Sequence, residues 1–488
     1  MKGTLKIGKK KLKLSSNKNS NINNGSSNDE QDGEDRLSSL PETLLTDILS
    51  RLPLHSAAAT SVLSHRWRHR WTQLNRLHFN CLRFQTIRFS KFTTTVDRIF
   101  QQLTSPKIYS FRVHYPYATT EKQIGKWNSY FGSLIPRICG LNPKEIQVIL
   151  EVPSTRYPLI SLPLCIFKTP SLVVLQLTGP FLCEVPKNLI FSFPNLKTLE
   201  LNLLHMNFDL MGKIIKSCPL LESLSLELIW SEDDEYDLKI STPNLKSLAI
   251  YMNGYLEDIK VFIDAPKLEY VLLHGRFAFY HFVNNQGTLL EADLGFCSSS
   301  FEGRKDYLSH ISVLLREISS VRTIHLRDNI AVFNPSNHVD ANVLNTFCNL
   351  TRVCLVRVSL DQLDWSVPIP ACLLAKLKWM VLDEFVGDED DLKLIKYFLN
   401  ETKVLEELCV YSTFYDPTEE EESEKDQIWR ETNFCKDLFM LLRPSTCEIK
   451  YSGEYIHSSS KTVKNGSMLC RIDQIEKEEP IFDFWIGD

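Results

Sequence analysis

One phrase, a proline followed by leucines at fixed spacing, returns along the middle of the chain. Its five clearest copies follow the pattern Pro-x-Leu-x-x-Leu-x-Leu and begin at Pro170, Pro194, Pro219, Pro243 and Pro266. Successive copies start 24, 25, 24 and 23 residues apart, a regularity that chance does not produce. A fixed period of this length indicates a repeat array, in which no unit closes its own core and stacking of neighbours supplies the stability.

Weaker copies without the proline follow around Leu294, Leu326, Leu355, Leu382 and Val410, so that ten repeats can be counted. The phrase and its period are those of the leucine-rich repeat, in which each unit adds one short parallel strand to a horseshoe. The leucines turn inward, and the residues between them face the concave side. We therefore expect an α/β solenoid whose ten strands form a concave ladder roughly 43 Å long.

The outward positions of the phrases form a mixed and mildly acidic surface on which nothing converges as a catalytic site would. Tyr251, Tyr270 and Trp379 are its candidate aromatic anchors. We expect this concave face to bind a protein partner of unspecified identity, with or without a small-molecule co-ligand. The residues assigned to it are Gln176, Glu200, Ser225, Tyr251, Tyr270, His274, His325 and Trp379.

Residues 34–80 have a different pattern, that of three short amphipathic helices. The spacing from Ser39 to Glu42 predicts a capping box before the first helix, which Pro53 ends. Ser56 and Ser64 are the predicted caps of the second and third helices. Two tryptophans and roughly ten Leu, Ile or Val residues exceed what three short helices can hide among themselves. The surplus predicts a docking partner.

The same residues resemble the F-box of plant F-box proteins. The likeness runs from Leu37-Ser-Ser-Leu-Pro-Glu42 to Arg66-Trp-Arg-x-x-Trp71 and departs at His65 and Arg70, where Lys and Leu are usual. It implies that the module binds a Skp-family adaptor, which connects it to a cullin, a RING protein and a ubiquitin-loaded conjugating enzyme. The residues implied in that interface or its immediate support are Leu40, Pro41, Leu44, Leu45, Ile48, Leu52, Leu63, Trp67 and Trp71.

Residues 368–412 resemble the FBD module that follows the repeats in many plant F-box proteins. The likeness predicts one irregular repeat, a helix from Asp390 to Asn400 and a further strand. The expected organisation is therefore a disordered basic tail (1–33), the F-box (34–80), a linker with degenerate first repeats (81–165), leucine-rich repeats (166–367), the FBD-like segment (368–412), and an acidic loop with a C-terminal cap (413–488). Within the tail, the run from Lys9 to Lys13 is either a nuclear import signal or a solvated basic segment.

Composition bounds the environment and the partners. Thirteen cysteines at irregular spacing, without a CxxC pair, indicate a reducing compartment, the cytosol or the nucleus. A net charge of −5 argues against binding of nucleic acid through overall charge alone. The sequence contains no run of about 18 apolar residues, so it predicts no membrane span. We therefore expect neither a membrane nor a nucleic acid as a partner.

Catalytic motifs are absent from the sequence: it has no GxSxG elbow, HExxH pair, Walker loop or GxGxxG turn. His65 and His69 have the spacing of two metal ligands on one helix but lack a third, so we expect no metal and no cofactor. The expected function is the substrate-recognition subunit of an SCF-type ubiquitin ligase, which contributes no catalytic residue. Two alternatives stay open: a repeat scaffold outside any ligase, and DNA binding through Arg66, Arg68 and Arg70 with the tryptophans.

Overall fold

We describe the fold from a computed structural model of the chain. The described residues are 37, 39–80, 89–116, 121–151, 160–182, 186, 189–205, 208–229, 237–253, 259–283, 287–296, 307–327, 346–356, 375–385, 387, 389–412, 424–443 and 447–459. The basic tail at 1–33, the first residues of the FBD-like segment (368–374) and the acidic run Glu419–Glu422 lie outside this part of the chain.

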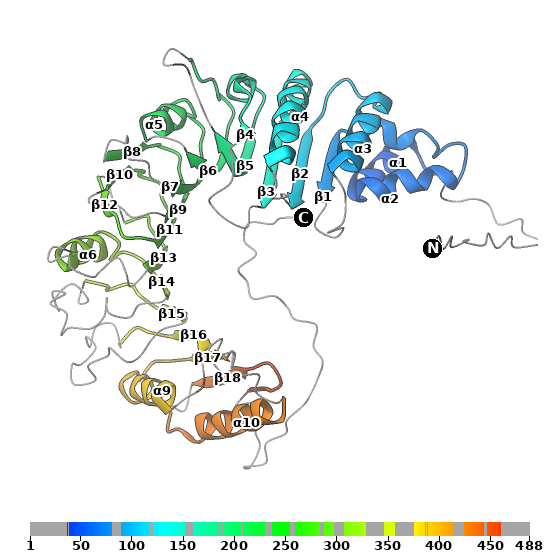
Figure 1. The fold of residues 1–488 in the computed structure, drawn as a ribbon. Helices are drawn as coiled ribbons and strands as arrows, with labels where there is room; N and C mark the ends of the chain where they lie inside the picture. Colours follow the sequence, from blue (N-terminus) through cyan, green and yellow to red (C-terminus); the bar gives the residue numbers. More distant parts are fainter. Residues whose placement is uncertain are drawn as a thin grey trace, which may run out of the picture.

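One long sheet extends from residue 76 to residue 459 and bends into an arc (Figure 1). Its strands follow the sequence order, with β4 (Ile160–Ser161) beside β5, and they are parallel up to the last, β19 (His457–Ser459), which is antiparallel to β18. The other members are β1 (Arg76–Asn80), β2 (Ser110–Pro116), β3 (Glu145–Glu151), β5 (Val174–Leu182), β6 (Thr198–His205), β7 (Ser223–Ile229), β9 (Ser247–Asn253), β11 (Tyr270–Gly275), β13 (Glu291–Phe296), β14 (Thr323–Arg327), β15 (Arg352–Val356), β16 (Trp379–Phe385), β17 (Glu407–Ser412) and β18 (Glu448–Ser452).

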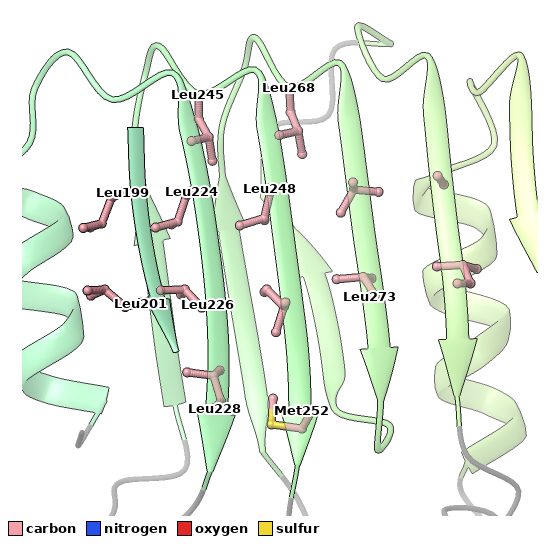
Figure 2. Packing of buried hydrophobic residues seen from close by; sticks show 14 of the residues in the cluster. Leu199, Leu201, Leu224, Leu226, Leu228, Leu245, Leu248, Met252, Leu268 and Leu273 are labelled. Atoms are coloured by element: carbon pink, nitrogen blue, oxygen red, sulfur yellow. The ribbon is translucent and has the colours of Figure 1, made fainter. Parts of the chain in front are cut away.

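The register places the repeated leucines in rows. Leu199, Leu224 and Leu248 are direct neighbours across β6, β7 and β9, and the next inward row contains Leu201 and Leu226. Figure 2 shows these side chains on one side of the sheet, stacked from strand to strand. All five are at most 1% exposed. Each strand is thus stabilised by its neighbours, because a single repeat has no opposite wall of its own.

Helices and a second, smaller sheet cover the outer side of the arc. The helices are α3 (Phe89–Gln102), α4 (Glu121–Gly140), the 3₁₀ helix η4 (Leu164–Lys168), α5 (Phe208–Lys216), α6 (Tyr307–Glu317), α9 (Glu389–Glu401) and α10 (Glu424–Met440). In the middle of the arc, β8 (Asp237–Ser241), β10 (Lys260–Asp264) and β12 (Phe279–Phe282) form a parallel three-stranded sheet instead (Figure 1).

The predicted leucine-rich-repeat solenoid is confirmed, since each of the ten repeats contributes one strand to the concave ladder. The ladder is longer than predicted, because β1, β2, β3 and β18 extend it at both ends. Fourteen parallel strands give a curved ladder roughly 62 Å long. The sequence did not reveal β1, β3 and β18 because Phe, Val, Ile or Tyr replaces leucine at one or more positions of the phrase in each of them.

The N-terminal module departs from its predicted helix boundaries. Its first helix, α1 (Glu42–Arg51), has Pro41 rather than Ser39 at the N-cap position, so the predicted helix start with Ser39 as the cap is wrong. Likewise α2 (Leu54–Ala59) begins after Pro53, which places Ser56 inside the helix. Pro41 (φ −56°, ψ 149°) and Pro53 (φ −52°, ψ 141°) have the non-helical backbone that is typical of an N-cap residue.

The predicted third helix is also wrong. Two 3₁₀ helices, η1 (Thr60–Val62) and η2 (Arg70–Gln73), flank a series of turns at residues 65–69. Trp67 nevertheless lies in the core, at 2% exposure.

The module is continuous with the first strand of the ladder. Thr104 donates its backbone N–H to the carbonyl of Thr72 (2.8 Å), and Tyr109 donates to that of Asn75 (2.7 Å). Leu74 and Leu77, on either side of this boundary, belong to one hydrophobic core that extends from Leu45 into the repeats. The helical module is therefore packed onto the solenoid rather than tethered to it.

Candidate functional site: two interaction surfaces

Exposed aliphatic side chains gather on the N-terminal module. On α1, Leu44 is 48% exposed, and Ile48 and Leu52 follow it at four-residue intervals along the same side of the helix. Val62 and Leu63, at the end of η1, are 86% and 58% exposed. A module of this size with so much uncovered apolar surface has the character of a docking face.

The residues that the F-box resemblance assigned to the interface divide into two groups by burial. Leu44, Leu52 and Leu63, together with Pro41, are exposed. The buried or partly buried ones pack against the core and so belong to the support of the surface: Leu40, Leu45, Ile48, Trp67 and Trp71. Val62 was not among the assigned residues, although it directly precedes Leu63 after an alanine-rich helix, a position that could have indicated it.

Arg70, the departure from the F-box pattern, connects η2 to the first helix. Its guanidinium pairs with both carboxylate oxygens of Glu42, and Arg66 approaches the same carboxylate at 3.6 Å. Where the F-box pattern has leucine, this arginine therefore forms an ion pair within the module. Two of the three arginines on which the DNA-binding alternative depends are therefore already paired with Glu42. The segment that carries them forms turns rather than a recognition helix.

His65 and His69 lie in the turns between η1 and η2 and not on a helix. Among the described residues, no group of three or more His, Cys, Asp or Glu side chains is placed to hold a metal ion. A membrane-crossing helix, both long and apolar enough, is likewise not found in this part of the chain. The eight described cysteines are all free thiols.

The concave face brings several of the predicted binding residues together. Gln176, Glu200 and Ser225 are direct neighbours across β5, β6 and β7, and Gln176 Nε2 donates to Glu200 Oε1 at 2.9 Å. Tyr251 and His274 are neighbours across β9 and β11, with their rings edge to face at 5.7 Å. Tyr270 lies on the same strand as His274.

A charged network across β11, β13 and β14 was not predicted as a site. Asp293 is only 3% exposed although it belongs to a concave position. His274 Nε2 donates to its Oδ1 at 2.7 Å, and Arg327 Nε approaches the same oxygen at 3.3 Å. Burial alone would raise the pKa of Asp293, but the hydrogen bond from His274 and the charges of Arg327 and His325 outweigh it and lower the pKa. The sequence has acidic residues at outward positions of β13 and basic residues at outward positions of β14, and this pattern could have indicated the network.

His325 forms the second pair of this network, donating from Nε2 to Glu291 Oε1 at 2.7 Å. Burial opposes its charge, but its contacts with Cys354 and Glu291 and the carboxylate of Asp293 raise its pKa to about 10. His325, which was predicted to bind a partner, is therefore paired within the chain with Glu291 on the concave face. Trp379, two strands further along the sheet, stands apart from this group at 37% exposure, with the Lys378 ammonium 5.7 Å from its ring centre.

A helical docking module fused to a repeat horseshoe defines an interaction protein with two surfaces. Comparison with known domains identifies both parts. Residues 37–79 match the F-box domain, and residues 366–410 match the FBD. Residues 142–286 match the family described as "FBD-associated F-box protein At5g56370, LRR repeats".

Relatives from Arabidopsis thaliana extend the match over most of the chain. F-box/FBD/LRR-repeat protein At5g22660 is 27% identical, with 77% of this chain and 90% of that protein covered. FBD-associated F-box protein At4g10400 is 27% identical (75% and 90% covered), and F-box protein At4g09920 is 30% identical (50% and 74% covered). The chain belongs to the plant F-box/FBD/LRR-repeat family.

Proposed function

We propose that this protein is the substrate-recognition subunit of an SCF-type ubiquitin ligase. Its F-box would dock on a Skp-family adaptor, and its concave face would hold the protein target. One observation carries the proposal: Leu44, Val62 and Leu63 are exposed on a module that matches the F-box domain and is packed onto a repeat horseshoe. The family supports it, since F-box proteins with leucine-rich repeats are generally non-catalytic adaptors.

The mechanism would be proximity. The adaptor and its cullin would bring a ubiquitin-loaded conjugating enzyme to one end of the molecule, and the concave face would hold a target lysine within reach. Holding two reactants together raises their effective concentration and removes much of the entropic cost of their encounter. Because the F-box and the first strands share one core, the target would sit at a fixed distance from the adaptor. Such a complex would work in the cytosol or the nucleus.

The proposal is tested by co-purifying the full chain with a plant Skp-family adaptor. The informative variant is Leu44→Asp with Leu63→Asp, because both side chains are exposed and their replacement leaves the core intact. Trp67 is unsuitable for this purpose, since its burial would make loss of binding indistinguishable from unfolding. Capture of the wild type and of a Glu401→Gln control, but not of the double variant, is the expected result.

Failure of the folded wild-type chain to capture any adaptor would contradict the proposed ligase role. A repeat scaffold outside any ligase would then be the better interpretation, because the concave face can bind a protein without an adaptor. DNA binding gains no support from the arrangement at Arg66 and Arg70, whose side chains are committed to Glu42.

A further inference from the structure

We propose that the concave face across β6, β7, β9 and β11 recognises a target segment that carries lysine or arginine. This inference rests on the proposed function, in which the concave face binds the protein target, and it adds the chemistry of that target. It is carried by two half-buried carboxylates that have no cationic partner, beside an exposed tyrosine.

The outward positions in this part of the ladder are one-sided in charge. The strands β5, β6, β7, β9, β11 and β13 present eighteen of them, at three positions a strand. None is lysine or arginine, whereas four are carboxylates: Glu200, Glu227, Glu291 and Asp293. These eighteen positions therefore carry four acidic side chains and, apart from His274, no basic one.

Two of the four carboxylates are already neutralised from within the chain. Glu291 accepts from His325, and Asp293 accepts from His274 and Arg327. These pairs consume their cations internally, so Glu291 and Asp293 shape the edge of the face rather than offer charge to a partner.

Glu200 and Glu227 differ, because only uncharged amides reach them. Gln176 Nε2 lies 2.9 Å from Glu200 Oε1, and Asn253 Nδ2 lies 2.6 Å from Glu227 Oε1. Within the described residues, neither carboxylate forms an ion pair. Burial raises the pKa of both, and the amide bonds offset this only in part. A partly buried charge without a counter-charge is costly, and a cationic side chain from a partner would relieve that cost.

Tyr251 provides the aromatic member of the same surface. It is the register neighbour of Glu227, is 38% exposed, and is held edge to face against His274. Burial raises the pKa of its hydroxyl, and the carboxylates of Asp293, Glu200 and Glu227 raise it further against the opposing charge of Arg327. An ammonium or guanidinium over a tyrosine ring is attracted by the ring quadrupole as well.

The spacing suits a peptide segment rather than a lone ion. Glu200, Glu227 and Tyr251 lie on three successive strands, β6, β7 and β9, which are about 4.8 Å apart. Ser225 and Ala249, the neighbouring middle positions on β7 and β9, have small side chains and leave room above the sheet. A segment crossing the strands could place one basic side chain between the two carboxylates and another over Tyr251.

The test selects peptides from a phage-displayed dodecapeptide library on the full chain. The expected result is enrichment of Lys and Arg in the bound peptides. The best peptide, synthesised with a fluorescent label, is then titrated by anisotropy against the wild type, Glu200→Gln with Glu227→Gln, and the exposed, remote control Glu401→Gln. We expect the double variant to bind about 10-fold more weakly and the control to bind as the wild type does. Citrulline or acetyl-lysine at the basic positions of the peptide should reproduce the loss.

Several outcomes would overturn the inference. These are selection of peptides without Lys or Arg enrichment, selection of none at all, or equal affinity for the wild type and the double variant. Binding that appears only after residues 1–33 are deleted would identify the lysine-rich tail of the same chain as the occupant and overturn the assignment to a partner. Adaptor capture is scored on the same preparations, so that a failure of the charge inference is distinguishable from a failure of the proposed ligase role.

Discussion

On the concave face, Asp293 is as buried as many of the leucines behind the sheet. A carboxylate at such a depth is stable only when other groups compensate its lost hydration. Here His274 and Arg327 do so from the two adjacent strands, and Gly295 gives them room: a Cβ at this glycine would lie 3.1 Å from the His274 ring and 3.3 Å from Arg327 Cβ. The charged pairs at Asp293 therefore depend on the lack of a side chain at Gly295 as well as on His274 and Arg327.

The pH dependence of stability should report on His325. Its folded pKa of about 10 lies above the ordinary histidine value of about 6.5. Its contribution is thus complete below pH 6.5 and is lost as the pH rises through 10. We expect the difference in unfolding free energy between the wild type and His325→Gln to shrink across this window, by at most about 1.4 kcal/mol per pH unit. Urea denaturation of both proteins at pH 6 to 10 measures it, and a constant difference would contradict the assignment.

The inward leucines should be far less tolerant than the outward residues beside them. Leu199 is fully buried between its register neighbours Leu175 and Leu224. We expect Leu199→Ala to lower the unfolding free energy by about 2–5 kcal/mol, because it removes apolar contact and leaves a cavity. Ser225→Ala, an outward change on the next strand, should shift it by less than about 0.5 kcal/mol. Equal effects in denaturant titrations would mean that the two faces have been exchanged.

Among the elements, α10 is fixed to the end of the ladder by one carboxylate. The buried Glu431 accepts backbone N–H groups from Glu454, Tyr455 and Ile456 at 2.9, 3.1 and 2.9 Å, in the turn between β18 and β19. At Gly453, a Cβ would lie 2.5 Å from Glu431 Oε2. The side chain therefore accepts three backbone donors of this turn and connects α10 to the end of the ladder.

Glu431→Ala should release this cap. Three backbone donors would lose their acceptor, at a cost on the order of 3 kcal/mol. Hydrogen exchange of the amides at residues 454–456 should accelerate strongly, whereas Glu431→Gln, which keeps one acceptor oxygen, should have a smaller effect. Gly453→Ala should mimic the alanine variant without removing the carboxylate. Unchanged exchange in both alanine variants would show that the turn is held by other contacts.

The predictability of the elements followed from how much of each pattern is local. Leucine rows at a constant period determine strands whatever else surrounds them, and the helix expected at Asp390–Asn400 is observed as α9, Glu389–Glu401. The start of α1 at Glu42 could not be derived in the same way, because Ser39 and Pro41 both satisfy the usual rules for a helix start and only the packed structure selects between them. The network at Asp293 joins residues from three strands up to 53 positions apart, so that only the register reveals it.

At the scale of the whole molecule, the continuous core determines how the two surfaces are related. An F-box on a flexible tether would let the concave face adopt many orientations relative to an adaptor. Packing of Leu74 and Leu77 across the boundary, with the backbone bonds at Thr72 and Asn75, fixes one orientation instead. In a repeat array each unit also contacts only its neighbours, so that disturbance at one end should fade with distance along the ladder.

This coupling predicts how damage to the F-box spreads. Trp67→Ala removes a buried indole and should cost about 3–5 kcal/mol locally. Because the core continues into the ladder, the amides of β1 and β2 should lose hydrogen-exchange protection together with those of α1 and α2. The amides of β9 and β11, many repeats away, should keep theirs and act as the internal control. Loss confined to residues before Asn75 would instead make the F-box an independently folding unit, and its orientation relative to the concave face would then be free rather than built into the fold.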